Sequence, residues 1–207
     1  MRNTFDYIAP YYDTLASFIF GKNLVNAKKE FLHLIPSHGR LLLMGGGTGT
    51  ILNHLLESHP ELIIDFIEAS PKMLELAKKK VKAAFIHRVN FIHGTHHQIS
   101  SAAKYDAATS FFVMDCLKQA DALEFATVVT NALKSGGSFL FADFFPVKNF
   151  YHRILLWTMY RFFRLVAGIH ATALPDYDVI FNRLKLKEKG RNNFLNGFIQ
   201  SRVYHTG

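Results

Sequence analysis

The stretch Leu41-Leu42-Leu43-Met44-Gly45-Gly46-Gly47-Thr48-Gly49 decides the fold of this chain. Its four apolar residues have the composition of a buried strand, and the run stops at the first glycine. Glycines adopt positive φ readily and let a ligand approach the backbone closely. A helical pattern follows over residues 50–56, so the first amides of that helix can bind an anionic group. No Gly-Lys-Ser/Thr follows, which excludes a phosphate-binding P-loop; a tight turn without a ligand stays the alternative.

Short apolar runs alternate with amphipathic segments outward from this stretch, through residues 40–145. Further strands are expected at 62–67, 89–93, 106–113 and 138–142, with helices at 70–81 and 120–133. Ser70-Pro71 is typical of a helix start, with Ser as N-cap and Pro at the first position. This alternation predicts a doubly wound parallel sheet covered on both faces. Ligands of such sheets bind at the carboxyl ends of the strands.

The last third of the chain has a different pattern. We expect an aromatic-rich helix over 150–167 and a shorter one over 176–184, followed by strands at 184–194 and 198–205 around Asn196-Gly197, a strong hairpin signal. The sheet should therefore end in an antiparallel pair. The prediction is one domain over 1–207, with an N-terminal helical cap (1–39), a cofactor-binding core (40–145), lid helices (146–183) and a terminal hairpin (184–207).

Glu68 ends the second predicted strand about 20 residues after the glycine loop. An acid at this place can accept both hydroxyls of a ribose, although a solvated strand-end acid is the simpler alternative. Loop and acid together predict a nucleoside site. They leave a dinucleotide and S-adenosylmethionine as alternatives.

Several motifs in order resemble the class I S-adenosylmethionine-dependent methyltransferases: residues 41–49, 64–74, 105–108 and 133–137. Residues 5–13 resemble the opening of the quinone-biosynthesis C-methyltransferases. The resemblance implies a Rossmann-like, seven-stranded α/β sheet, mostly parallel, and a transferase with S-adenosylmethionine as cofactor and S-adenosylhomocysteine as product. The glycine run also resembles the aminopropyltransferases, but their paired aspartates are not evident after the fourth strand.

Carried over position by position, the resemblance implies that Glu68 holds the ribose hydroxyls and that Tyr12 reaches the cofactor's amino-acid end or shields the reacting centre. The other expected cofactor contacts are Gly45, Gly46, Gly47, Thr48, Gly49, Ala69, Met73, Thr95, His96, Phe112 and Val113. The family usually has an acid at the place of Leu43, and an Asp where Thr95 stands. Leu43 cannot accept a hydrogen bond, so either cofactor affinity is reduced or another group substitutes.

Methyl transfer needs alignment and exclusion of water, and a base only if the acceptor must lose a proton. Asp115 and Asp143, just past the fourth and fifth strands, are candidate bases or acceptor anchors; the alternatives are a helix cap and a solvated loop acid. No metal site is predicted, because no carboxylate or Cys completes a ligand set with His96 and His97. Cys116 is interpreted as a buried thiol.

The charge of +8 is concentrated in the tail: residues 1–146 hold 14 Lys+Arg and 13 Asp+Glu, whereas 147–207 hold 10 and 3. This basic tail is compatible with an anionic substrate or membrane surface, whereas the order of the motifs and the aromatic lid favour a small aromatic or lipophilic acceptor. Peripheral membrane contact through 148–169 and a dimer interface are alternatives to a lid packed on the N-terminal helices. Nucleic acid is disfavoured, because the loop after the fourth strand lacks an Asn/Asp-Pro-Pro-aromatic signature. No signal peptide or spanning segment is expected, which predicts a cytoplasmic protein. A degenerate scaffold with weak or no catalysis is the alternative function.

Overall fold

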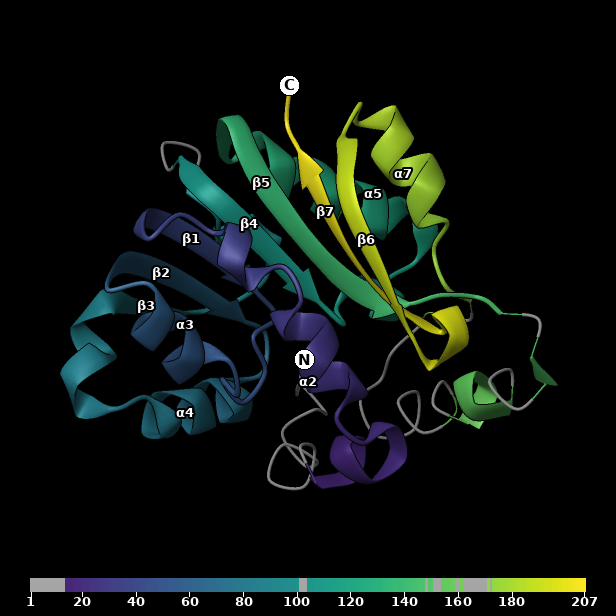
Figure 1. Ribbon diagram of the computed structural model, residues 1–207, viewed down its shortest axis with the longest axis horizontal. Helices are drawn as coiled ribbons and strands as arrows, with labels where there is room; N and C mark the ends of the chain where they lie inside the picture. The colour runs from purple at the N-terminus through teal and green to yellow at the C-terminus, as the bar shows by residue number, and fades with distance from the viewer. Residues whose placement is uncertain are drawn as a thin grey trace.

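A seven-stranded sheet with the order β3-β2-β1-β4-β5-β7-β6 forms the centre of the molecule (Figure 1). The computed structural model describes residues 14–100, 104–147, 149–150, 154–158, 161, 171 and 173–207. Its strands are β1 (His38–Met44), β2 (Glu61–Glu68), β3 (Val89–His93), β4 (Tyr105–Phe111), β5 (Leu133–Phe144), β6 (Lys187–Phe194) and β7 (Ile199–His205). The strands β1 to β5 pair in parallel, and β7 pairs antiparallel with both β5 and β6. The predicted mixed sheet is confirmed.

The order of the strands reverses at β1, which pairs with β2 on one side and β4 on the other. Because all three strands run in the same direction, their carboxyl ends meet at one edge of the sheet. The glycine loop follows β1 at this point, and Glu68 is the last residue of β2. This is the place where open α/β sheets bind ligands.

Helices cover both faces of the sheet, with α5 behind it and α2 in front of it in Figure 1. The longer helices are α2 (Asn23–Lys29), α3 (Leu52–Ser58), α4 (Pro71–Lys80), α5 (Gln119–Asn131) and α7 (Tyr177–Arg183). Successive side chains of a strand point to opposite faces. Leu41 and Leu43 therefore join the core under α3, whereas Leu42 and Met44 join the core under α5 and α7. Both faces of β1 are thus buried, as its continuous apolar run indicates.

Several element boundaries differ from the sequence prediction, and turns explain the differences. The helix after the glycine loop begins at Leu52, because a turn closed by a bond from Leu52 N to Gly49 O comes first. β4 ends at Phe111, since Phe112 has a φ of 58°. β5 begins at Leu133, ahead of the expected position 138, because Leu133 already pairs with Tyr105 before the register shifts.

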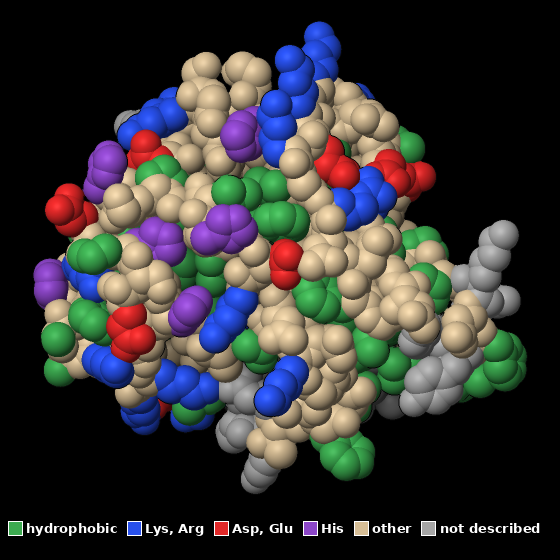
Figure 2. Space-filling view, viewed as in Figure 1, with side chains coloured by type: hydrophobic (Ala, Val, Ile, Leu, Met, Phe, Trp, Pro, Cys, Tyr) green, Lys and Arg blue, Asp and Glu red, His purple; other side chains and the backbone are tan. Residues whose placement is uncertain are grey.

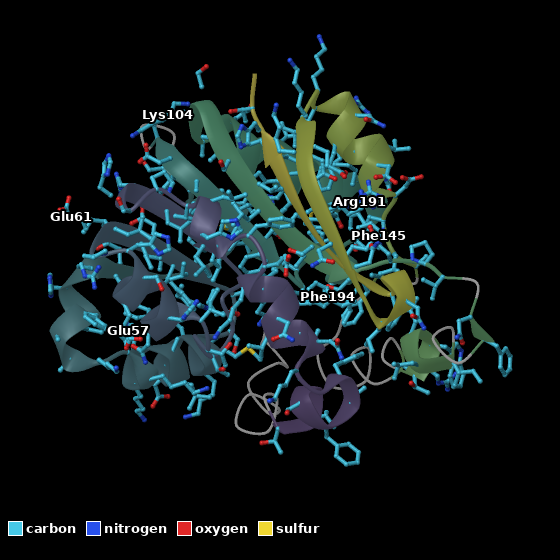
Figure 3. All side chains as sticks on the ribbon, in the orientation of Figure 1. Glu57, Glu61, Lys104, Phe145, Arg191 and Phe194 are labelled. Atoms are coloured by element: carbon cyan, nitrogen blue, oxygen red, sulfur yellow. The ribbon has the colours of Figure 1, made fainter. Side chains whose placement is uncertain are left out.

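The C-terminal elements follow the prediction closely. α7 begins after Asp176, whose side chain accepts a hydrogen bond from Val179 N. The β6–β7 hairpin closes through a 3-10 turn at Leu195–Gly197, and Arg191 and Phe194 lie along β6 (Figure 3). Part of the basic charge of the tail is structural, because Arg202 is 1% exposed and bonded to Asp178.

Most of the expected lid helix lies outside the described residues. Residues 154–158 are helical, and Trp157 is 59% exposed, with the Arg161 guanidinium 4.9 Å from its ring centroid. Phe150 is 74% exposed. These described residues therefore do not form a closed cover. Across the described part of the chain, no helix combines the length and apolar character needed to cross a membrane.

Candidate functional site

Three glycines of the glycine loop are packed too closely against other residues to carry a side chain, whereas Gly47 has open space beside it. Gly45 has a φ of 61°, and a Cβ there would lie 2.2 Å from Val113 Cγ2. A Cβ at Gly46 would lie 2.1 Å from Phe66 Cε2, and one at Gly49 would lie 2.9 Å from Ala77 Cβ. At Gly47, with a φ of 58°, the nearest atom to a Cβ is 4.0 Å away. Gly47 is therefore the position where the loop backbone faces open space.

Glu68 is a buried carboxylate that ties the glycine loop to the next helix. It is 7% exposed; its Oε2 accepts a hydrogen bond from Gly47 N and its Oε1 accepts one from Ser70 N, each at 2.9 Å. Burial raises the pKa of Glu68, and these amide bonds oppose the rise. Each carboxylate oxygen has a second lone pair. Glu68 can therefore hold the loop and still accept two hydroxyl donors.

A cavity of about 470 Å³ opens at the carboxyl ends of the strands, within the usual range for small-molecule sites. It brings together nine of the residues selected from the sequence: Gly45, Gly47, Glu68, Ala69, Met73, Thr95, His96, Phe112 and Val113. They come from the end of β2, from the segments that follow β1, β2, β3 and β4, and from the first turn of α4. Gly46, Thr48 and Gly49 do not line the cavity; Thr48 is 3% exposed and accepts a hydrogen bond from Lys80 Nζ.

The loop after β3 forms the wall that carries Thr95 and His96. The Thr95 hydroxyl accepts a hydrogen bond from His97 N, and Thr95 N donates to Gln98 Oε1 at 2.7 Å, which closes a capping box on the short helix η3 (His96–Gln98). His96 packs edge-on against Phe125 of α5. Burial, and then the neighbouring His97, lower the pKa of His96, which keeps its imidazole neutral near pH 7.

Asp143 does not lie where the sequence places it. It is inside β5, fully buried, and accepts hydrogen bonds from the backbone N–H groups of Met114 at 3.1 Å, Asp115 at 3.2 Å and Phe144 at 2.8 Å. The alternative of a solvated loop acid is therefore wrong. Asp143 holds η4 (Met114–Cys116), the turn after β4, against the sheet, and it does not line the cavity.

Asp115 is also buried, at 7% exposure, and absent from the cavity lining. It lies inside η4 and does not cap α5, which begins after Lys118. Burial raises its pKa to about 6, and burial beside Asp115 raises the pKa of Asp143 well above the usual range. Burial thus favours the protonated form of both acids, and Asp115 also accepts a hydrogen bond from the Cys116 thiol.

Cys116 lines the cavity and donates a hydrogen bond from Sγ to Asp115 Oδ1 at 3.4 Å. Burial and the neighbouring carboxyls raise the pKa of this thiol. It therefore stays protonated and weakly nucleophilic, but the residue is only partly buried, whereas the sequence predicts a buried thiol. Tyr12, the third residue selected for catalysis, lies outside the described residues.

Lys28 is the main residue that the sequence analysis did not select. It reaches the cavity from α2, with Nζ 5.8 Å from the ring centroid of Phe112. Leu43 is 1% exposed and belongs to the core, so the position of the usual family acid has no contact with the cavity. The glycine-loop end of the cavity thus carries a cation on α2 and no acid at position 43. The sequence alone does not single out Lys28 as a cavity residue, because several other lysines occur nearby in the chain.

Comparison with known proteins agrees with this geometry. Residues 42–139 match the model of a methyltransferase domain. A malonyl-[acyl-carrier protein] O-methyltransferase of Halalkalibacterium halodurans is 32% identical over 110 residues, which cover 51% of this chain and 39% of that protein. The chain thus spans about two fifths of the length of this curated relative.

Solved structures share the fold at low sequence identity. A chain from a complex of the Haloferax volcanii Trm112 methyltransferase activator with a methyltransferase has a TM-score of 0.77 at 15% identity, covering 100% of this chain and 99% of that one. CalO1, a methyltransferase of calicheamicin biosynthesis bound to S-adenosylhomocysteine, has a TM-score of 0.67 at 16% identity, covering 95% and 56%. Residues 42–139, just under half of the chain, thus match a methyltransferase domain, and the fold is that of solved methyltransferase structures; together with the order of the motifs, these findings support a class I S-adenosylmethionine-dependent methyltransferase.

Proposed function

We propose that this protein transfers a methyl group from S-adenosylmethionine to a small aromatic or lipophilic acceptor. The observation that carries the proposal is the convergence of Gly47 and the buried Glu68 carboxylate on one cavity. The cavity fits the cofactor's needs: an open backbone position at Gly47, an acceptor for two hydroxyls, and a mostly apolar wall. When bound, the cofactor supplies an electrophilic methyl group on a sulfonium.

The residues of the cavity divide between the parts of the cofactor. Glu68 would accept the ribose hydroxyls. Ala69, Met73 and Thr95 would surround the adenine, and Lys28 would pair with the carboxylate of the amino-acid end. In members of the methyltransferase family, an acid at the position of Leu43 helps to hold the cofactor through its ammonium group. Lys28 would replace part of that interaction by holding the cofactor's carboxylate instead. The loss of that acid is therefore compatible with cofactor binding.

Alignment and exclusion of water are the main contributions that the chain would make to the reaction. Phe112, Val113 and Leu117 present apolar surface beside the glycine loop. Neither Asp115 nor Asp143 reaches the cavity, so neither is proposed as the base. They act on the site indirectly, because Asp143 fixes the turn that carries Cys116.

Three groups on the cavity wall bear on the acceptor: Lys118, Asp121 and His96. The acceptor atom would arrive already ionised, or would give its proton to His96 or Asp121. The relative from Halalkalibacterium halodurans is named for O-methylation of a malonyl group, and a carboxylate needs no base. A carboxylate acceptor beside Lys118 is therefore a second candidate within the same reaction.

Calorimetry with S-adenosylmethionine, S-adenosylhomocysteine and 5′-methylthioadenosine tests the proposal. We expect all three to bind, because each carries the ribose and adenine. Lys28→Met should lower the affinity for S-adenosylhomocysteine about tenfold, which corresponds to roughly 1.4 kcal/mol of binding free energy. The affinity for 5′-methylthioadenosine should not change, because this ligand has no carboxylate. Failure of the wild type to bind any of them at millimolar concentration would refute the proposal. Binding of S-adenosylmethionine without its conversion to S-adenosylhomocysteine in the presence of any tested acceptor would favour a scaffold.

A further inference from the structure

Two histidines and a glutamate from distant parts of the sequence meet beside the cavity, and one of the three, His96, also lines it. His96 and His97 lie on η3, and Glu124 lies 27 residues beyond His97 on α5. Their potential ligand atoms all lie within 4.8 Å of one another. We propose that His96, His97 and Glu124 bind a divalent transition metal, with zinc as the best fit. This proposal does not depend on methyl transfer.

The distances are close to those that a metal needs. His96 Nε2 lies 3.6 Å from Glu124 Oε1, and His97 Nδ1 lies 3.9 Å from the same oxygen. Ligands at about 2.0–2.1 Å in a tetrahedral zinc site are about 3.4 Å apart. The gap between His96 and Glu124 is too long for a good hydrogen bond and near the spacing of two atoms that share a metal. Small rotations of exposed side chains would bring all three atoms to one centre.

His96 Nε2 supplies an observation that is independent of this spacing. The atom is buried and has no hydrogen-bond partner among the described residues. A buried polar atom left without a partner carries a free-energy cost that a metal ligand bond removes. The same Nε2 atom lies 3.6 Å from Glu124 Oε1.

The set of donors selects the kind of metal. Two imidazoles and one carboxylate suit zinc, nickel, copper or cobalt, whereas calcium and magnesium prefer oxygen ligands only. His97 and Glu124 are 61% and 58% exposed, so solvent reaches the centre. Three protein ligands would leave at least one coordination position for water or another small ligand. Because His96 lines the cavity whereas His97 and Glu124 do not, the metal would lie next to the cavity, on the solvent side of His96.

Two elements hold the ligands in place, which distinguishes this group from scattered surface histidines. The capping box of Thr95 and Gln98 fixes η3, and His96 packs against Phe125, the residue next to Glu124 on α5. The rings of His96 and His97 are 4.1 Å apart between centroids. The positions of all three ligands are thus determined by the ordered contact between η3 and α5.

Two titrations of the metal-free protein test the proposal. Zinc binding is measured by calorimetry, and cobalt binding is measured by visible absorption. We expect one site of micromolar or tighter affinity and the absorption bands of tetrahedral cobalt. His97→Ala and Glu124→Gln each remove a ligand that faces solvent, so both variants should fold. Each substitution should lower the affinity for zinc by more than the roughly 10–100-fold that is lost when a residue hydrogen-bonded to a metal ligand is replaced.

His87→Ala is the matched control, because His87 is an exposed histidine on η2 (Ala83–Arg88) outside this group. Its zinc affinity should equal that of the wild type. Absence of a stoichiometric site in the wild type would overturn the proposal. Unchanged zinc affinity in both His97→Ala and Glu124→Gln would also overturn it, by showing that zinc binds elsewhere. Neither result bears on cofactor binding, which the calorimetry described above measures separately.

Discussion

Replacement of Glu68 by alanine gives the sharpest test of the cofactor site. The carboxylate is 7% exposed and bonded to Gly47 N and Ser70 N, so its two oxygens are fixed in position before any ligand arrives. A hydrogen bond to a charged group contributes about 1.5–3 kcal/mol, so loss of two ribose bonds costs about 3–6 kcal/mol. At 1.4 kcal/mol per decade, Glu68→Ala should weaken S-adenosylhomocysteine roughly 10²–10⁴-fold.

The assay is calorimetry on Glu68→Ala, Glu68→Gln and a control at Asp65. Glu68→Gln keeps one acceptor oxygen and should bind with intermediate affinity. Asp65 is a buried acid on the same strand that accepts hydrogen bonds from Arg40, Asn90 and Tyr105, away from the cavity. Asp65→Asn should lower the melting temperature and leave affinity unchanged. Equal affinity of folded Glu68→Ala and wild type would refute the ribose role.

Two further predictions concern stability. Asp115 keeps its proton up to about pH 6 when folded but ionises near pH 3.8 when unfolded, so the folded state binds more protons between these values. Carboxyls with a lowered pKa, such as Glu75, act in the opposite direction, so the test compares two proteins. The free energy of unfolding of the wild type relative to Asp115→Asn should fall as pH rises from about 4 to 6, by of order 3 kcal/mol in urea unfolding, and a difference that does not change with pH would contradict the assignment. Gly49→Ala should destabilise more than Gly136→Ala, by about 1–3 kcal/mol in urea unfolding, because both have positive φ but only Gly49 is crowded, by Ala77. Equal losses would show that φ alone decides.

On the face shown in Figure 2, Lys and Arg lie in separate groups with Asp and Glu between them. Several of the described basic side chains are engaged in ion pairs, such as Arg191 with Glu188 and Lys134 with Asp106. A net charge of +8 is therefore not expressed as one continuous basic surface on this face.

The sequence was most informative where structure depends on neighbours along the chain. The apolar run 41–44 gave a strand, Ser70-Pro71 gave a capped helix start, and Asn196-Gly197 gave a hairpin turn. Each of these features depends on the backbone preferences of neighbouring residues or on the alternation of side chains between the two faces of a strand. Glu68 could be placed at the end of a strand for the same reason, and strand ends of a parallel sheet share one edge.

By itself, the sequence thus determined the order of the elements, the mixed sheet and the loops that face the ligand. Only the tertiary structure decided that Asp143 is a buried anchor, that Lys28 reaches the cavity, and that Glu124 meets His96. The physical reason is that these placements depend on packing between elements far apart in the chain. A residue type and its spacing do not record which distant side chain or backbone amide it will meet when the sheet and helices close around the core.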